Sequence, residues 1–286
     1  MKLVLNLTLF LASLNLTAQV LTPSLRIKPE DDGIIPKSSI HANNTTNAID
    51  VPFIRFDDIM WSTRHWEKIN VREKINHPLY YPLKELSDRK SLYAIITDAA
   101  IEEGRLDGFV FKDDMFMKPL SASELKTRMS IQNTYYVDGD PNLGIDTIVN
   151  IPIDPATVVE YKIKSDWYFD KQRGEMRAQI IAICPVIVDS EAFGDSKPRD
   201  LCWIFYPALR NVLASQVAYN PSNNSRRITF DQLFQMRYFN AVVYKQDNVF
   251  DRTIADYSNY DRMFQLLESQ RIREELRDYE GSLWQF

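Results

Sequence analysis

The sequence predicts an α+β fold with an antiparallel sheet centred on a long hairpin over about residues 158–188. A further strand over 201–206 joins this sheet, and helices flank it. In the first arm of the hairpin, apolar and polar side chains alternate with a period of two, which is typical of a strand with one buried face. Residues 170–174 (DKQRG) are polar and end in glycine, so they predict the turn. The return arm is apolar on both faces over Ile180–Cys184, which indicates a central strand.

The pattern of faces also predicts the register of this hairpin. Apolar side chains oppose one another when Phe169 pairs with Met176, Trp167 with Ala178, and Ile163 with Ala182. A shift of one residue would place Trp167 opposite Arg177, which a sheet with a buried face disfavours.

Helices dominate the region before the hairpin. Helix-like apolar spacing after the acidic pair Asp57–Asp58 predicts a helix over 59–71. A single apolar stripe predicts a second helix over 91–103, and Gly104 is placed to end it. Three further elements are expected: a strand over 109–117, a short helix over 123–129 capped by Ser121 or Ser123, and a hairpin with strands over 131–137 and 145–153.

Helices are also expected after the hairpin. They cover residues 208–217, residues 230–239 with Thr229 as the cap, and residues 258–278 with Gly281 as the stop. The chain then ends in an apolar tail that contains Trp284 and Phe286. Such a tail either packs on its own domain or is presented to a partner.

Composition and charge exclude several classes of function. The chain has 286 residues, enough for a substantial core, and a net charge of −5 with no more than two basic residues in a row. Binding to nucleic acid is therefore not expected, because neutralising phosphates requires clustered Lys and Arg. Only 8 glycines are present, which argues against a glycine-rich nucleotide-binding loop.

Residues 1–18 have the pattern of a signal peptide. Lys2 precedes an apolar run over 3–16, and Ala18 stands before the expected cut. The alternative is a buried N-terminal helix or an uncleaved anchor. No Cys lies near the cut, so the chain itself is not expected to be a lipoprotein, and no other stretch is long enough to span a membrane.

An extended N-terminal arm is expected over residues 19–50, where prolines and polar residues are frequent. The arm is either a solvated leader or a docking peptide, and in the second case Pro23, Leu25 and Ile27 are the candidate contacts. A single domain over 51–260 and a C-terminal helix and tail over 261–286 follow.

The two cysteines, Cys184 and Cys202, fall on strands expected to be neighbours. In an oxidising compartment they could form a disulfide. The alternative is two buried free thiols that behave as small apolar residues.

No motif for catalysis, cofactor binding or metal binding is found in the sequence. The H-E-x-x-H, G-x-S-x-G, P-loop and G-x-G-x-x-G patterns are absent. Residues 138–142 begin like a calcium loop, but Leu143 and Val149 occupy positions that need Gly and Glu, so a hairpin turn is expected there. At the tip of the long hairpin, Lys171 and Arg173 are either partner contacts or part of a solvated turn.

Several sequence blocks together resemble one family. They are DWYFDK at 166–171, IIAICPV at 180–186, CWIFYP at 202–207, FDQLF at 230–234 and NVFDR at 248–252. This set is similar to the gliding-motility GldN (PorN) family, part of the type IX secretion machinery of Bacteroidetes. The resemblance covers roughly residues 50–260.

The resemblance implies a structural role without catalytic residues or cofactors. Family members are periplasmic ring components, associated with the outer membrane through a GldK/PorK-like lipoprotein. They also contact the periplasmic part of a GldM/PorM-like motor subunit. A homo-oligomer within a ring is expected, with no membrane span. The alternative is a periplasmic enzyme or small-ligand-binding protein with an unrecognised site, and a secreted adhesin-like module is a weaker third option.

Overall fold

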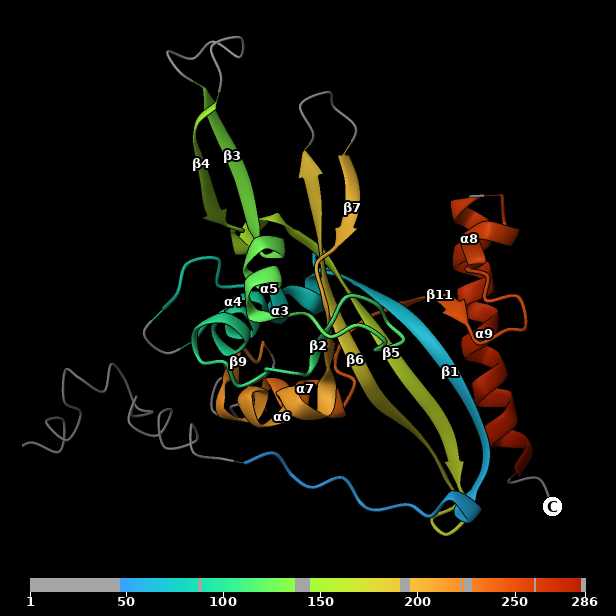
Figure 1. Ribbon diagram of the computed structural model, residues 1–286. Coiled ribbons are helices and arrows are strands. Elements are labelled where there is room, and N and C mark those ends of the chain that lie inside the picture. Colours follow the sequence, from blue (N-terminus) through green and yellow to red (C-terminus); the bar gives the residue numbers. More distant parts are fainter. Residues whose placement is uncertain are drawn as a thin grey trace, which may run out of the picture. The chain divides into compact units, whose positions relative to one another are not determined.

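The computed structural model confirms the α+β class and the antiparallel sheet. The main sheet has the strand order β11-β1-β5-β6-β8-β2, and β7 pairs with the outer part of β6 (Figure 1). Its strands are β1 (Ile59–Asn70), β2 (Val110–Phe111), β5 (Val158–Asp170), β6 (Glu175–Ser190), β7 (Ser196–Asp200), β8 (Trp203–Phe205) and β11 (Val242–Gln246).

The structure describes residues 47–283 except 87–88, 137–144, 191–195, 222, 224–227 and 260. The signal-peptide pattern, most of the arm with Pro23, Leu25 and Ile27, the turn at 138–142, and the tail residues Trp284 and Phe286 lie outside this range. Residues 46–286 form one compact unit, which includes the C-terminal helix. In the described part of the chain, no helix combines the length and apolar character needed to cross a membrane.

The β5–β6 hairpin has the predicted register at its tip and a different one further in. Phe169 pairs with Met176 and Trp167 with Ala178, as expected. The predicted pairing of Ile163 with Ala182 is wrong, because Ile163 lies opposite Ile183. The cause is a β-bulge: Ser165 pairs with Ile180 and Lys164 with Ala182, so Ile181 has no opposite residue on β5.

The apolar return strand is covered on both faces, as predicted. On one face, a row of directly paired side chains runs across the sheet: Val243, Glu67, Ile163, Ile183, Ile204 and Val110. Its isoleucines belong to the main core, together with side chains of α4, α6 and α7. Ala182 and Cys184 enter a second cluster, on the other face, with Trp66 and Trp203.

The second face is built from lysines and aromatic rings. Lys164 is only 2% exposed; its Nζ donates to the backbone oxygen of Asp114 at 2.5 Å and lies over the rings of Trp66 and Phe116. Burial lowers the pKa of Lys164. Trp66 Nε1 donates to Asp114 Oδ2 at 2.9 Å, which holds the loop after β2 against this face. The alkyl stem of a lysine can thus serve as core material when its ammonium group is hydrogen-bonded.

The helix predicted over 59–71 is wrong, because these residues form strand β1. This strand pairs with β5 along nearly its whole length and with β11 on its other side. Its polar residues obscure the period of two: His65 and Glu67 are buried on one face, while Arg64 on the other face forms an ion pair with Asp166 opposite it. Long-range pairing therefore overrides the local helical spacing.

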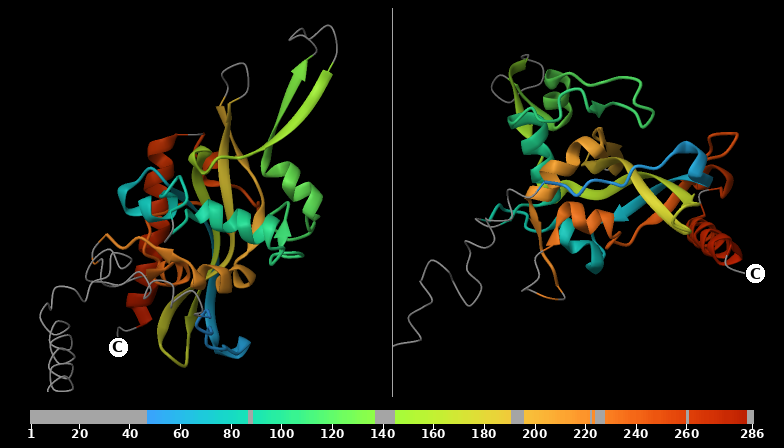
Figure 2. Two further views of the ribbon diagram at one scale, coloured as in Figure 1. Left: turned by 90° about the vertical axis from the view of Figure 1, so that its left-hand side faces the viewer. Right: turned by 90° about the horizontal axis from the view of Figure 1, so that it is seen from below.

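The helices lie around the main sheet, whereas the ladder of β3 and β4 projects away from it (Figures 1 and 2). The helices are α3 (His77–Tyr80), α4 (Leu92–Thr97), α5 (Ala122–Arg128), α6 (Tyr206–Ser215), α7 (Phe230–Gln235), α8 (Ile254–Tyr257) and α9 (Arg262–Leu283). Shorter turns are η4 (Phe56–Asp58), η5 (Lys74–Asn76), the π-helical η6 (Asp98–Glu102) and η9 (Pro155–Thr157). Two small ladders are β3 (Ser130–Tyr136) with β4 (Ile145–Pro152), and β9 (Val217–Ala218) with β10 (Ile228–Thr229).

Most predicted helix starts are confirmed, because their caps are local in sequence. Ser91 caps α4, Ser121 and Glu124 form a capping box at α5, and Thr229 caps α7. Gly104, with a φ of 61°, ends the π-helical extension of α4 as expected. The hairpin expected over 131–153 is also present as β3 and β4.

Other predicted boundaries are wrong. The strand expected over 109–117 is reduced to β2, the helix expected over 230–239 ends at Gln235, and strand β11 was not predicted. Helix α9 continues through Gly281 to Leu283, because Gly281 does not take the left-handed conformation of a helix stop. Pro207 lies in the first turn of α6, so it begins a helix where the third strand ends.

Cys184 and Cys202 are both buried free thiols in the structure, which is the alternative to a disulfide. Their side chains belong to different clusters, Cys184 to the one with Trp66 and Cys202 to the main core. Burial raises the pKa of both thiols, that of Cys202 to about 12, so the protonated form is favoured.

The hairpin tip is held by the turn before β1. Lys171 N donates to the backbone oxygen of Asp58 at 2.9 Å, and the side chain of Lys171 is exposed. Arg173 Nη1 lies 3.1 Å from Oδ2 of the buried Asp170. Arg173 is therefore a stabilising residue of the turn, whereas Lys171 remains available to a partner.

We expect charge reversal at these two tip residues to have different effects on the stability of the domain. Arg173→Glu places a second carboxylate beside buried Asp170 and should lower the free energy of unfolding by about 1–2 kcal/mol. Lys171→Glu, the matched control for stability, should change it by less than about 0.5 kcal/mol. Denaturant unfolding at pH 7 measures both values, and equal effects of the two variants would contradict the assignment of Arg173.

Candidate functional site

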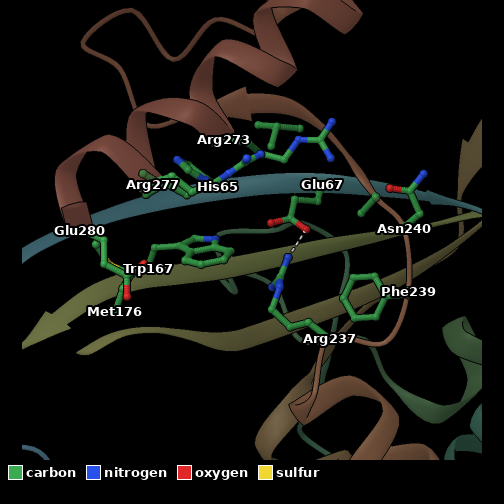
Figure 3. A pocket seen from close by; sticks show the side chains of 13 residues that line it. His65, Glu67, Trp167, Met176, Arg237, Phe239, Asn240, Arg273, Arg277 and Glu280 are labelled. Carbon is green, nitrogen blue, oxygen red and sulfur yellow. Dashed lines mark hydrogen bonds and ion pairs between the residues drawn. The ribbon is translucent and has the colours of Figure 1, made fainter. Parts of the chain in front are cut away.

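A groove lies on the sheet face that carries Ile163 and Ile183. It consists of two cavities of about 300 Å³ and 720 Å³ that share Trp167, Met176 and Arg237 in their walls. The smaller cavity lies beside α9 and is seen from close by in Figure 3. The larger one continues along β6 towards α7 and the segment over residues 49–52. We call the two together the sheet groove.

Arg237 is placed in the groove by the end of helix α7. Arg237 N donates to Phe234 O at 3.0 Å and Tyr238 N donates to Leu233 O at 3.0 Å, which is the hydrogen-bond pattern of a Schellman motif. The motif requires a left-handed residue, and Arg237 has a φ of 50° where glycine is usual. For a residue other than glycine, this left-handed conformation costs about 1 kcal/mol. It places the guanidinium group of Arg237 in the groove.

Glu67 meets this guanidinium from strand β1. Arg237 Nη2 lies 2.5 Å from Oε2 of Glu67, and Glu67 is only 3% exposed (Figure 3). The guanidinium also lies 4.7 Å from the ring centre of Trp167 and 5.2 Å from that of Phe239. Pairing and stacking together compensate the burial of both charges.

His65 lies two residues before Glu67 on the same face of β1 and is 1% exposed. Neither ring nitrogen has a hydrogen-bond partner among the described residues. Burial lowers the pKa of His65 to about 4; the charge of Glu67 opposes this shift and that of Arg237 adds to it. The imidazole is therefore neutral at pH 7.

Unsatisfied polar atoms converge on the smaller cavity. Besides the ring nitrogens of His65, Trp167 Nε1 and Arg237 Nη1 are buried without a hydrogen-bond partner in the described part of the chain. From α9, Arg273 and Arg277 line the same cavity, and neither has an ion-pair partner among the residues described here (Figure 3). Glu280 of α9 also lines the cavity, so its wall carries three arginines and two carboxylates, together with several hydrogen-bond donors.

A second candidate surface is apolar and exposed. It contains Val249 and Phe250 in the loop before α8, which are 97% and 73% exposed, and three residues of the first turns of α9. These three are Met263, Leu266 and Leu267. We call these five residues the α9 surface.

The apolar residues of α9 occupy two different sides of the helix. Ser269, Ile272 and Leu276 are buried and face the sheet. At about 100° per residue, Met263 and Leu267 point away from that buried side. Helix α9 therefore has a second apolar stripe, confined to its first turns, that no described residue covers.

The sequence does not bring the central residues of the sheet groove together. His65 and Glu67 lie in the helix expected over 59–71, and Arg237 lies in the helix expected over 230–239. The sequence does contain a signal for strand β1. His65, Glu67 and Ile69 occupy every second position, with Trp66 between the first two, and this period of two fits a strand that buries polar groups on one face. Among the described residues, no group of three or more His, Cys, Asp or Glu side chains is arranged to hold a metal ion.

Over residues 54–285 the sequence matches a family of gliding-motility-associated proteins, which identifies the chain as a component of that machinery. The family is described as "Gliding motility associated protein GldN", and the chain belongs to it. The match confirms the resemblance and includes the α9 surface and all of the sheet groove except residues 49–52. Comparison with curated proteins finds no match.

Replacement of Arg237 should be more destabilising than removal of both partners of its ion pair. Arg237→Met leaves the buried carboxylate of Glu67 without a cation and should lower the free energy of unfolding by about 3 kcal/mol. The double variant Glu67→Met with Arg237→Met should lose less than Arg237→Met alone. Arg271→Met, at the exposed pair with Glu268, is the matched control and should cost less than about 1 kcal/mol. A double variant that costs the sum of both single changes would contradict this expectation.

Acid should destabilise the protein through His65. The unfolded chain takes up this proton near pH 6.5, whereas the folded chain does so only near pH 4. Unfolding therefore binds a proton in this window, so stability is complete above about pH 7 and falls as the pH is lowered. Between pH 7.5 and 5 the contribution of His65 is a loss of about 2 kcal/mol. His65→Gln, which cannot titrate, should show a pH dependence smaller by this amount, and an unchanged dependence would contradict it.

Proposed function

We propose that this GldN family member is a non-enzymatic, periplasmic structural subunit of the type IX secretion and gliding-motility machinery. It assembles with a GldK/PorK-like outer-membrane lipoprotein into a ring-like complex and contacts the periplasmic part of a GldM/PorM-like motor subunit. Copies of the chain are neighbours within the ring. Family membership supports this assignment, and the signal-peptide pattern at residues 1–18 supports export to the periplasm.

The observation that carries the assembly role is the α9 surface. Several exposed apolar side chains on one element are costly in water and mark interaction sites on folded proteins. Phe250 and Leu267 are 73% and 59% exposed although they belong to an otherwise well-packed region, where Ile254 and Ile272 form a small core with Val243. A subunit that buries this surface against a neighbour would gain free energy in proportion to the apolar area removed from water.

A second surface that supports assembly lies before strand β1. Phe53 and Phe56 are both 88% exposed on the segment that runs to the hairpin tip (Figure 1). The start of this segment is held to the domain, since Arg210 Nη2 donates to Ile49 O at 2.5 Å. Together with the exposed side chain of Lys171, these aromatic residues offer a contact site distinct from the α9 surface.

The smaller cavity of the sheet groove favours an alternative function, the binding of a ligand. The smaller cavity of the sheet groove combines a volume of about 300 Å³ with convergent unsatisfied donors, which are features of binding sites. The two functions are compatible, because a structural subunit can bind part of a partner in such a cavity.

Leu267→Glu should disrupt assembly without unfolding the domain. A charge in the middle of the α9 surface opposes its burial, so the amount of lipoprotein that co-purifies with the full chain should fall at least tenfold. Gln270→Glu adds the same charge one turn further along the exposed side of α9 and serves as the control, with co-purification expected to be unchanged. Electron microscopy of the wild-type complex should show rings.

Two outcomes would count against these proposals. Normal association of the Leu267→Glu variant would exclude the α9 surface as the interface. A wild-type protein that remains monomeric and ignores the lipoprotein would overturn the proposed function itself.

A further inference from the structure

The smaller cavity of the sheet groove has an unusual balance of hydrogen-bonding groups. Buried polar atoms are nearly always hydrogen-bonded, because an unsatisfied buried group has lost its hydrogen bonds to water without replacing them. Here three neighbouring side chains keep buried nitrogen atoms without a partner among the described residues: both ring nitrogens of His65, Trp167 Nε1 and Arg237 Nη1. Trp167 Nε1 and Arg237 Nη1 can only donate, so the partner that these two atoms lack is a hydrogen-bond acceptor.

The charge of the cavity agrees with one negatively charged acceptor, since its wall carries three arginines against the two carboxylates of Glu67 and Glu280. Arg273 and Arg277 reach its rim from α9, and the described residues provide no ion-pair partner for either of them (Figure 3). Arg237 uses one end of its guanidinium for Glu67 and presents Nη1 without a partner. The arginine fork suits a planar group with two oxygen atoms.

We propose that this cavity binds the carboxylate of an acidic side chain presented by a partner protein. A singly charged carboxylate first meets the exposed guanidinium groups of Arg273 and Arg277, and a small shift of the wall side chains brings it to Trp167 Nε1 and Arg237 Nη1, which are buried in this structure. The carboxylate of Glu67 also lies in the wall, and its charge disfavours a phosphate dianion at the same place. Neutral His65 adds one further N–H donor.

The shape of the groove points to a protein segment as the source of this carboxylate. The smaller cavity shares Trp167, Met176 and Arg237 with the cavity of about 720 Å³, so the binding region extends well beyond one functional group. That second cavity follows residues 176–179 of β6, where the described strands leave one edge of β6 unpaired, since β8 begins to pair only at Ala182 and Ile183. An extended segment can lie along such an edge and place an acidic side chain in the cavity. This choice of a partner rests on the proposed function, whereas binding of the carboxylate does not.

The inference can be tested on the full chain by NMR of the tryptophan side chains. The chain has five tryptophans, and the Trp167→Phe variant, which keeps the ring shape but lacks the N–H group, assigns the indole signal of Trp167. The probe is N-acetylglutamate α-amide, and the matched control is N-acetylglutamine α-amide, which differs only in the side-chain charge. We expect a saturable shift of the Trp167 signal with the glutamate probe only. The Trp66 signal should stay constant, because Trp66 Nε1 already donates to Asp114.

Variants of the exposed rim test the charge without disturbing the core. Arg273→Gln together with Arg277→Gln should weaken binding of the glutamate probe at least threefold. Arg262→Gln, on the same helix but outside the cavity, should leave the affinity unchanged. Both sets of variants change exposed residues, so they remain informative if Trp167→Phe fails to fold.

Three outcomes would overturn the inference. These are no shift of the Trp167 signal with the glutamate probe, an equal shift with the glutamine control, and saturation by inorganic phosphate where the glutamate probe has no effect. None of these results depends on co-purification with the lipoprotein. Failure of this proposal is therefore distinguishable from failure of the proposed function.

Discussion

The structure depends above all on the pairing of strand β5 with β1 on one side and β6 on the other. These two ladders run over nearly the full length of β5 and place its side chains alternately on two covered faces. One face receives the helices of the main core, and the other receives the layer of lysines and aromatic rings around Trp66. Because β1 carries His65 and Glu67, the same pairing also positions the floor of the sheet groove.

Local signals made much of this fold predictable. The hairpin turn, the register at its tip and the caps at Ser91, Ser121 and Thr229 all depend on residues close in sequence. The groove could not be predicted in this way, because its central ion pair joins residues 170 positions apart. Glu67 is tolerated on the buried face only because Arg237 reaches it, and Arg237 does so from a left-handed position where a glycine would be expected.

The sheet groove and the α9 surface use different physical means of association. The α9 surface is apolar and exposed, so it gains stability from any contact that removes it from water. The groove holds buried donors that have no hydrogen-bond partner among the described residues, so binding there would depend on a matching acceptor. A subunit with both features can combine strong binding with selective binding, since directional polar groups discriminate among partners better than apolar area does.

The bulge at Ile181 determines how the hairpin can change in length. Ile180 and Ala182 pair with consecutive residues of β5, so deletion of Ile181 would leave a regular ladder with every other side chain on its present face. Deletion of a neighbouring paired residue, such as Ile183, would instead transfer part of the strand to the opposite face. Insertions and deletions among related sequences should therefore be tolerated at Ile181, and rejected at the paired positions next to it.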